Sequence, residues 1–540
     1  MKTSENKKGG ASVEIKVEAG ACSLQGKAQE IANAFRYELS RLEKHGITSY
    51  AVTTVGCRGL CFKAPLVEVT TPLAGTILYQ RVKPLEVSQI VREHILNEKP
   101  VAHLQMDRCY QPFFSKQERR VLRNCGEIEP SDIEAYRKRG GYAGLEKVIM
   151  TMKPEEVLKE IKDSQLRNRD SHAAYTAEQL DDYRKEALHP KYLTCRGEGE
   201  SSEACVTLAL MEGDPFSIIE GMTILAYCIP GVAKGYIVHD RKVHPLVVKR
   251  MENAIKTARE KGYLGERIMG LPFGFNLELT ASDDALSPGG SYASCKECAQ
   301  LLGTRMVSAG AREALYAYDT DATDQYGTIF NAETFATIPL ICAHGSSWFK
   351  AVGTADSPGT KVFSLVGSVN QPGLVEVAYG TTLAQILELL NNDPHAVKAF
   401  IMGGLGSAFL PGDFLNRPLT HSALQHAGSG IGSGRILIID QQHSIPDITR
   451  YAVEKEINRS HGGTLPCSEV LKTIVHLLNK VPSGLTQGDL LILKNTGESL
   501  MKNARCASVR LTSFTILSGL KYFEEEFTGR HSLEIAQQLS

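Results

Sequence analysis

Short apolar runs alternate with helical patterns over the N-terminal part of the chain. The runs with apolar residues at alternate positions are VEIKV, SYAVTTVG, PLVEVTT and TILYQRV, and the helical patterns are AQEIANAFRYELSRLEKHG and VSQIVREHIL. Alternation predicts half-buried strands, whereas apolar residues three and four positions apart predict amphipathic helices. The order strand, helix, strand, strand, strand, helix over residues 12–104 therefore predicts a small α/β domain.

A polar connector over residues 105–140 separates this domain from a longer α/β segment over residues 141–356. The connector carries SKQERRVLRN and ends in RKRGGY, which predicts a linker with a short helix. The helices predicted in the longer segment are MKPEEVLKEIKDS and PLVVKRMENAIKTAREKGYLGE, and the strands are KYLTC and AKGYIVHD. In the first of these helices Pro154 stands early, and Val157 and Ile161 recur at helical spacing.

The C-terminal part of the chain has two further patterns. Residues 357–440 include GTKVFSLVGSVNQPGLVEVAYGTTLAQILELL, which predicts strand, turn, strand, a Gly-Thr-Thr cap and a helix in a compact β-rich domain. Residues 441–530 contain several helical stretches and little strand, which predicts a helical bundle. The fold class predicted for the whole chain is multidomain α/β.

Length, charge and cysteine content narrow the classes of function. The 540 residues exceed the roughly 250 to 300 at which a single hydrophobic core stops growing, so we expect three or four domains. The net charge is -1, which argues against nucleic acid as a partner and against a cationic membrane face. The polar N-terminus and the lack of any apolar window of about 18 residues predict a cytoplasmic protein without direct membrane insertion. In such a chain the 13 cysteines are expected to be thiols or metal ligands rather than disulfides.

A series of motifs follows the order found in a known family. They include GGYAGLEKVI, KPEEVLKEIKDSQLR, KYLTC, MEGDPFSIIEGM, NAETFATIP, GTKVFSLVGSVNQPGLVEVAYGTTL, HAGSGIGSGRILIID and LKYFEEEF. Together they resemble the NADH-oxidising flavoprotein subunit of respiratory complex I and its equivalents in NAD-linked hydrogenases and formate dehydrogenases, over residues 140 to about 527. The resemblance implies a Rossmann-like FMN/NADH domain at 141–356, a β-grasp SLBB-like domain at 357–440, an iron–sulfur-type helical bundle at 441–530 and, ahead of them, a thioredoxin-like ferredoxin domain at 12–104.

The resemblance also implies a flavin-binding loop after the first helix of the Rossmann-like domain. In the family this loop reads G-L-R-G-R-G-G-A-G-F-P-T-G, and glycine suits it because glycine adopts positive φ and lets a phosphate approach the backbone. Here the glycine positions hold Gln165, Asn168, Asp170, Ser171, Ala173 and Ala177. One of the family's paired asparagines is also replaced, by Phe330, whereas Asn331 keeps the other. Because side chains would crowd the flavin and an aspartate would repel its phosphate, we expect degenerate FMN and NADH sites and no bound FMN.

The [4Fe–4S] motif of the family is changed as well. In the family, S-C-G-K-C-T-P-C and a later cysteine supply four thiolates, the usual requirement for such a cluster. Here SHGGTLPC places His461, Thr464 and Cys467 at the three motif positions, and Cys506 takes the fourth. Threonine is a poor ligand, so we expect no normal [4Fe–4S] cluster, with Cys467 and Cys506 buried in the bundle core.

The N-terminal cysteines are closer to a complete set of ligands. Cys57 and Cys61 form C-x3-C after a predicted strand, and Cys22 precedes a predicted helix. They resemble the ligands of the thioredoxin-like [2Fe–2S] ferredoxin, whose cluster takes two cysteines from each of two such loops. The fourth ligand would be a Ser23 oxygen or a residue from elsewhere, so a [2Fe–2S] cluster and a purely structural relic both stay open.

Another group of cysteines offers a second candidate metal site. Cys295 and Cys298 form C-x2-C, and the family fold would place Cys195 and Cys205 in loops around the same pocket. Four thiolates at an emptied nucleotide site would suit zinc or an iron–sulfur cluster. A C-x2-C pair within a helix is also found in protein cores, and this interpretation stays open.

These patterns predict a degenerate flavoprotein-type subunit of a multi-subunit redox complex that is not catalytic alone. Its task would be scaffolding and electron relay through the N-terminal [2Fe–2S] cluster, and its partners would be the other subunits. One alternative is an active NAD(P)H:acceptor oxidoreductase with a rebuilt flavin site. Another is a metal- or ligand-binding module that uses residues 359–390 or the four cysteines of the second candidate site.

Overall fold

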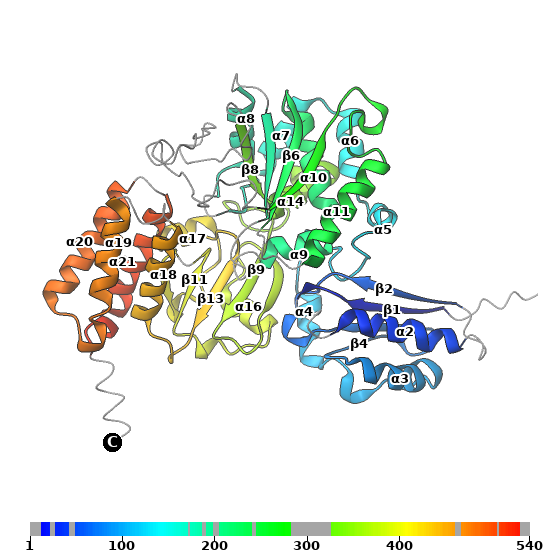
Figure 1. Ribbon diagram of the computed structural model, residues 1–540, viewed down its shortest axis with the longest axis horizontal. Helices are drawn as coiled ribbons and strands as arrows, with labels where there is room; N and C mark the ends of the chain where they lie inside the picture. Colours follow the sequence, from blue (N-terminus) through cyan, green and yellow to red (C-terminus); the bar gives the residue numbers. More distant parts are fainter. Residues whose placement is uncertain are drawn as a thin grey trace, which may run out of the picture.

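The computed structural model describes most of the chain. The described residues are 12–21, 27–42, 49–170, 173–185, 191–197, 205–239, 245–281, 326–404, 406–459, 466–504 and 507–529. They form an N-terminal unit, a parallel α/β unit, a mixed β unit and a C-terminal group of helices (Figure 1). The mixed β unit contacts each of the others.

The N-terminal unit contains a sheet of order β2-β1-β3-β4 against which α2 packs. Its elements are β1 (Ser12–Glu18), α2 (Ala28–Leu42), β2 (Ser49–Val55), β3 (Val67–Thr71), β4 (Gly75–Tyr79) and α3 (Val87–Ile90). Strand β1 is parallel to β2 and antiparallel to β3. On α2, Ile31, Phe35 and Leu39 recur at helical spacing and are buried. The predicted succession of strands and helices is confirmed.

Residues 105–140 form an ordered connector. The short helices in it are α4 (Gln111–Ser115) and α5 (Ile133–Lys138). The SKQERRVLRN segment between them forms turns, and the amides of Val121 and Leu122 donate to the buried carboxylate of Glu376 at 2.9 and 2.8 Å. The polar composition of the segment did not predict this burial, because the carboxylate lies 255 residues beyond Val121.

The next unit is built on a parallel sheet of order β7-β6-β5-β8. Its strands are β5 (Lys191–Gly197), β6 (Val232–His239), β7 (Asn276–Ala281) and β8 (Tyr326–Asn331). Its helices are α6 (Ala143–Thr151), α7 (Pro154–Ser164), α8 (Thr176–Lys185), α9 (Cys205–Gly213), α10 (Pro215–Cys228), α11 (Pro245–Glu260), α14 (Ala332–His344) and α15 (Ser346–Lys350). Helices α10 and α14 pack against each other and against α6. The strands predicted at KYLTC and AKGYIVHD and the helices α7 and α11 are confirmed.

A sheet of order β10-β9-β13-β11-β12 forms the mixed β unit. Its elements are β9 (Thr360–Gly367), β10 (Gly373–Ala378), α16 (Leu383–Leu389), β11 (Ala399–Met402), β12 (Phe409–Pro411), α17 (His421–His426) and β13 (Arg435–Ile439). The hydroxyl of Thr382 caps α16 by accepting the Gln385 amide at 3.3 Å. The strand, turn, strand, cap and helix predicted here are present.

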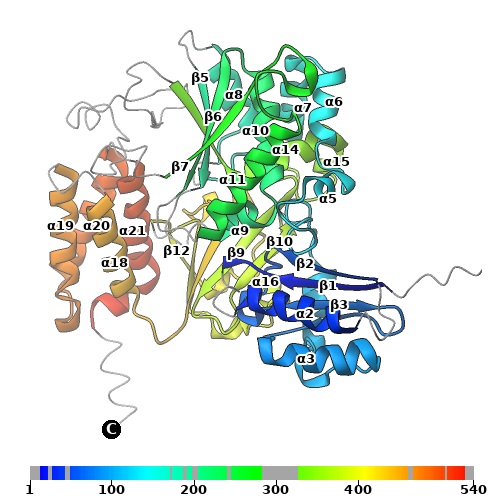
Figure 2. The same cartoon turned by 45° about the vertical axis from the view of Figure 1, so that its right-hand side comes forward.

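The C-terminal helices stand side by side (Figure 2). They are α18 (Ile445–Arg459), α19 (Pro466–Leu478), α20 (Gln487–Asn503) and α21 (Ala507–Phe527). Leu471, Leu493 and Ile516, from three of these helices, are fully buried in their shared core. The helical stretches predicted for this region are confirmed. In the described part of the chain, no helix is both long enough and apolar enough to cross a bilayer.

Candidate cofactor sites

The loop between α7 and α8 lies at the carboxyl end of β8, the edge at which parallel sheets bind ligands. Gln165 ends α7 with a φ of 58°, and Ala173 has a φ of 49°. Glycine enters this left-handed region without strain, whereas other residues rarely adopt it. The backbone therefore turns in a way that suits glycine at two positions where the family has glycine.

Asn168 joins this loop to the first turn of α14. Its Oδ1 accepts hydrogen bonds from the Asn331 amide at 3.1 Å and from the Thr334 hydroxyl at 2.8 Å. The Arg169 amide donates to the Thr334 hydroxyl at 2.9 Å. Asn331 in turn caps α14 by accepting the Glu333 amide. The helix terminus that would attract an anion is therefore engaged by side chains of the chain itself.

Arg169 points into the protein. It is 3% exposed, and its guanidinium donates to the Tyr379 hydroxyl and, at 3.1 Å, to the Thr360 carbonyl. The Tyr379 ring lies 5.3 Å from the ring of His421, centroid to centroid. Burial, together with Arg169 and Arg167, lowers the pKa of His421 to about 3. This histidine is therefore neutral at pH 7.

A buried ion pair adjoins the same turn of α14. Lys361 and Glu333 pair with side chains that are 0% and 1% exposed. Glu333 also accepts the Val362 amide at 3.0 Å, and Lys361 donates to the Ser433 carbonyl at 3.1 Å. Burial lowers the pKa of Lys361, while Glu333 acts in the opposite direction. The Glu333 carboxylate therefore balances the positive charge of Lys361 inside the protein.

Two further replaced positions, Asp170 and Ala177, and the replaced asparagine position, Phe330, also make local contacts. Asp170 closes a turn by accepting the Ala173 amide at 3.0 Å. Ala177 is buried on α8. Phe330, in the place of an asparagine of the family, is buried with its ring 5.7 Å from that of Phe335.

Cys57 and Cys61 lie where β1 and β2 end together. The two strands are parallel, and Glu18 is opposite Val55 in their register. The side chains of Cys57 and Cys61 hydrogen-bond each other, and the Gly59 amide donates to Cys57 Sγ at 3.3 Å. Hydrogen bonds to sulfur are one of the features by which proteins tune iron–sulfur clusters. The structure therefore brings these two predicted ligands together.

Two carboxylates that sequence reasoning missed lie next to these cysteines. Glu18 is 2% exposed, and its carboxyl group lies beside the Cys57 thiol. Glu212 is 4% exposed and accepts the Ala21 amide at 2.9 Å. Alternation along β1 puts Glu18 on the same face as the exposed Glu14, but the end of α9 covers it. Burial raises the pKa of Glu18 to about 8. The available signal was an acidic residue at a strand end, four positions before the first cysteine.

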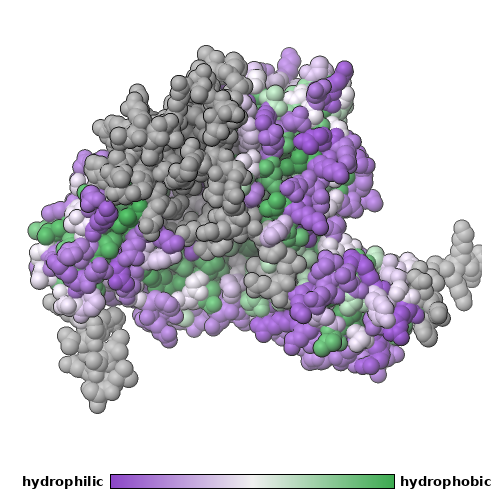
Figure 3. All heavy atoms as spheres, in the orientation of Figure 1, coloured by the Kyte–Doolittle hydropathy of each residue, from purple (hydrophilic) through white to green (hydrophobic). Residues whose placement is uncertain are grey.

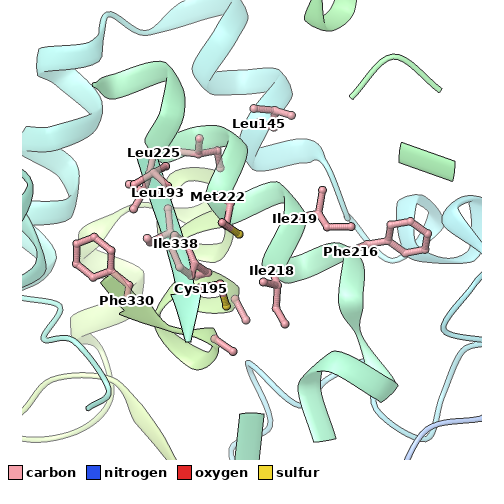
Figure 4. Close-up of a cluster of buried hydrophobic side chains, with 14 of the residues drawn as sticks. Leu145, Leu193, Cys195, Phe216, Ile218, Ile219, Met222, Leu225, Phe330 and Ile338 are labelled. Atoms are coloured by element: carbon pink, nitrogen blue, oxygen red, sulfur yellow. The ribbon is translucent and has the colours of Figure 1, made fainter. Parts of the chain in front are cut away.

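Cys195 lies in the apolar core of the parallel unit. Its side chain is among those of Leu193, Met222 and Ile338 (Figure 4), and burial raises the pKa of its thiol. Cys205 begins α9 and is half-buried. Across the residues that the structure describes, no three His, Cys, Asp or Glu side chains converge as ligands of a single metal ion.

Several predicted site residues lie outside the described residues. They are Cys22, Ser171, Cys295, Cys298, His461 and Cys506. Cys467 lies in the first turn of α19. The ligand sets that include these residues stay predictions.

Curated proteins similar to this chain belong to oxidoreductases of several subunits. The HndC subunit of the NADP-reducing hydrogenase of Solidesulfovibrio fructosivorans is 32% identical over 416 residues, which are 76% of this chain and 83% of that protein. The F 2 subunit of the NADH-quinone oxidoreductase of Rhizobium meliloti is 31% identical over 419 residues, 75% of this chain and 96% of that protein. The chain belongs to this family of F-type subunits.

Membership of this family confirms the resemblance seen in the sequence. No family model matches the chain. The structure of an NAD+-reducing [NiFe]-hydrogenase in the H2-reduced state has a TM-score of 0.57, covers 98% of this chain and 88% of its own, and is 16% identical. That likeness shows a common fold.

Proposed function

We propose that this member of the F-type family is a degenerate flavoprotein-type subunit of a redox complex. It acts as a scaffold and an electron relay, and it does not oxidise NADH alone. The proteins similar to it are named as subunits of a hydrogenase and of a quinone oxidoreductase, so its partners are the other subunits of such a complex. The proposal includes a cytoplasmic location. The observation that carries it is the hydrogen-bonded loop between α7 and α8.

This loop does not fit the phosphate of FMN. Asn168 stands at a glycine position, and its side-chain carbonyl oxygen already accepts hydrogen bonds from Asn331 and Thr334 at the start of α14. Asp170, at another glycine position, adds a negative charge that would repel a phosphate.

The N-terminal unit supports the relay part of the proposal. We assign it as a thioredoxin-like ferredoxin domain, with the parallel unit Rossmann-like and the mixed β unit β-grasp SLBB-like. Cys57 and Cys61 fit two ligands of an iron–sulfur cluster, since both follow β2 and an amide donates to Cys57, and we assign Cys22 as a third ligand. A [2Fe–2S] cluster bound there would supply one-electron transfer. The C-terminal residues Cys467 and Cys506 supply two thiolates and do not fit a [4Fe–4S] cluster.

Cofactor counts on the anaerobically purified full-length protein test the proposal. We expect about two irons and two sulfides per chain, no flavin, no uptake of added FMN and no NADH-dependent dye reduction. About one FMN per chain together with dye reduction would instead establish the active NAD(P)H:acceptor oxidoreductase. Zinc without iron or flavin would establish the metal-binding module.

A further inference from the structure

The segment after β2 is covered at one end and reaches the surface at the other. Cys57 is 8% exposed, and Gly56 before it packs directly against the end of α9. The Leu374 amide of β10 donates to the Gly59 carbonyl at 2.8 Å. Cys61, in contrast, is half-buried. An electron that enters the N-terminal unit from solvent therefore has its shortest way in beside Cys61.

Phe62 and Met106 provide apolar surface beside this cysteine. Phe62 follows Cys61 directly and is half-buried, and its ring lies 5.6 Å from the ring of Tyr110, centroid to centroid. Met106 is also half-buried, and its amide donates to the Leu78 carbonyl of β4 at 2.8 Å. Both side chains pack from outside against the same buried cluster. Surfaces that bind other proteins commonly combine an apolar centre with a polar rim.

Three exposed cations lie around this apolar surface. Arg81 donates from Nε to the Phe62 carbonyl at 3.3 Å. Lys83 follows it by two positions, and Arg108 follows Met106 by two. Within the described part of the chain, none of the three cations pairs with a carboxylate. Their charges therefore face solvent.

The carboxylates near these cations are already engaged. Asp107 pairs with Lys63 at 2.9 Å, and Arg81 also acts on it electrostatically. Glu86 accepts the Lys83 amide at 2.7 Å. Four cations thus stand against two carboxylates, although the whole chain has a net charge of -1. The positive charge is concentrated where a candidate cluster ligand reaches the surface.

We propose that this cationic face docks an acidic one-electron carrier protein. It consists of Phe62, Lys63, Arg81, Lys83, Met106 and Arg108. The inference rests on the proposed function, because it names the kind of partner that exchanges electrons with the N-terminal cluster. The reduced carrier gives up one electron and the oxidised cluster accepts it. Opposite charges speed the encounter and orient the carrier, and a small interface lets the carrier leave after transfer.

Binding and electron transfer are measured on the full-length holoprotein. The probe is flavodoxin, an acidic one-electron carrier, and basic cytochrome c is the probe of opposite charge. Surface plasmon resonance gives the affinity, and stopped-flow absorbance gives the rate at which reduced flavodoxin reduces the cluster. We expect both to fall roughly tenfold when salt rises from about 20 to about 200 mM, and no binding of cytochrome c. Equal binding of the two probes, or binding of flavodoxin that does not depend on salt, would overturn the inference.

Charge reversal locates the binding surface. We expect the triple variant Arg81→Glu, Lys83→Glu, Arg108→Glu to lose flavodoxin affinity roughly tenfold at low salt. Its iron content and cluster spectrum stay those of the wild type, because none of the three is a candidate ligand. Lys99→Glu, at an exposed lysine of the same unit, is the matched control and keeps the wild-type affinity. If the triple variant does not fold, Lys83→Glu with Arg108→Glu decides, with a loss of several-fold expected.

The two proposals fail in different ways. Wild-type flavodoxin affinity in the charge-reversal variants would overturn the docking face and leave the relay intact. A protein without iron would overturn the relay. In that protein, loss of flavodoxin binding on charge reversal would still support the docking face, and unchanged binding would overturn it.

Discussion

Gln165 and Ala173 hold backbone conformations that cost energy for residues with a Cβ. Their φ angles of 58° and 49° lie in the left-handed region, which costs roughly 1–2 kcal/mol for a residue other than glycine. Local hydrogen bonds hold both residues, since the Gln165 amide donates to the Lys162 carbonyl and the Ala173 amide to Asp170. The surrounding contacts thus impose a turn that the residues themselves disfavour.

Gln165→Gly is expected to stabilise the parallel unit by about 1 kcal/mol, because glycine relieves the left-handed strain at the end of α7. The greater conformational entropy of glycine in the unfolded chain offsets only part of this gain. Gln165 is exposed, so no packing is lost. Urea unfolding followed by circular dichroism measures the change. Gln165→Ala, which keeps a Cβ, is the control, and equal stability of the two variants would contradict the prediction.

His421 makes the free energy of unfolding decrease as the pH is lowered below neutrality. Burial, with Arg169 and Arg167, lowers its pKa to about 3, whereas an unfolded chain has a histidine pKa of about 6.5. Between these values the unfolded state binds a proton that the folded state does not, so the free energy of unfolding decreases as pH decreases. From pH 7 to 5 the contribution is at most about 2 kcal/mol.

Urea unfolding at the two pH values checks this dependence. His421→Gln should lose less stability than the wild type on going from pH 7 to 5. His395→Gln, at an exposed histidine, should follow the wild type. A wild-type profile for His421→Gln would show that another group carries the dependence.

At the scale of helices and strands, the local sequence pattern predicts those elements whose own residues mark their ends and their buried face. Helix α7 has Pro154 in its first turn and one apolar face, and α16 has its Thr382 cap. Helices α10 and α14 are buried along almost their whole lengths, so no polar face marks their periodicity. The burial of Glu18 depends on α9, whose Glu212 lies 191 residues beyond Ala21. Alternation within β1 contains no information about that covering helix.

Glu376 fastens the connector to the mixed β unit. Its carboxylate accepts the amides of Val121 and Leu122 and the hydroxyl of Thr360. Glu376→Gln keeps the shape but turns an amide NH2 toward a donor, so it should destabilise the protein by about 1 to 3 kcal/mol. Limited proteolysis should then cut faster within residues 105–140. Glu388→Gln, at an exposed residue of α16, is the control, and equal cleavage of the two variants would contradict the prediction.

At the scale of the whole molecule, polar contacts join the units of the chain. Lys16 in the N-terminal unit pairs with Glu127 of the connector at 3.1 Å, and Asn124 of the connector donates to Asp214 at 2.8 Å. The outer face of the N-terminal unit seen in Figure 3 is mostly hydrophilic. A chain joined in this way suits a scaffold, and it makes the environment of the N-terminal cysteines depend on the parallel unit.

Gly56→Ala tests that dependence. The added Cβ would lie 2.5 Å from the Cα of Gly213, and backbone atoms cannot move aside as a flexible side chain can. The N-terminal unit must therefore shift away from α9, which breaks the bond from Ala21 to Glu212 and admits water beside Cys57. We expect faster proteolysis within the connector, a larger radius of gyration by small-angle X-ray scattering and unchanged circular dichroism. Gly430→Ala, with no atom within 4 Å of the new Cβ, is the control. If both variants gave the wild-type cleavage pattern and size, another contact would have to hold the N-terminal unit in place.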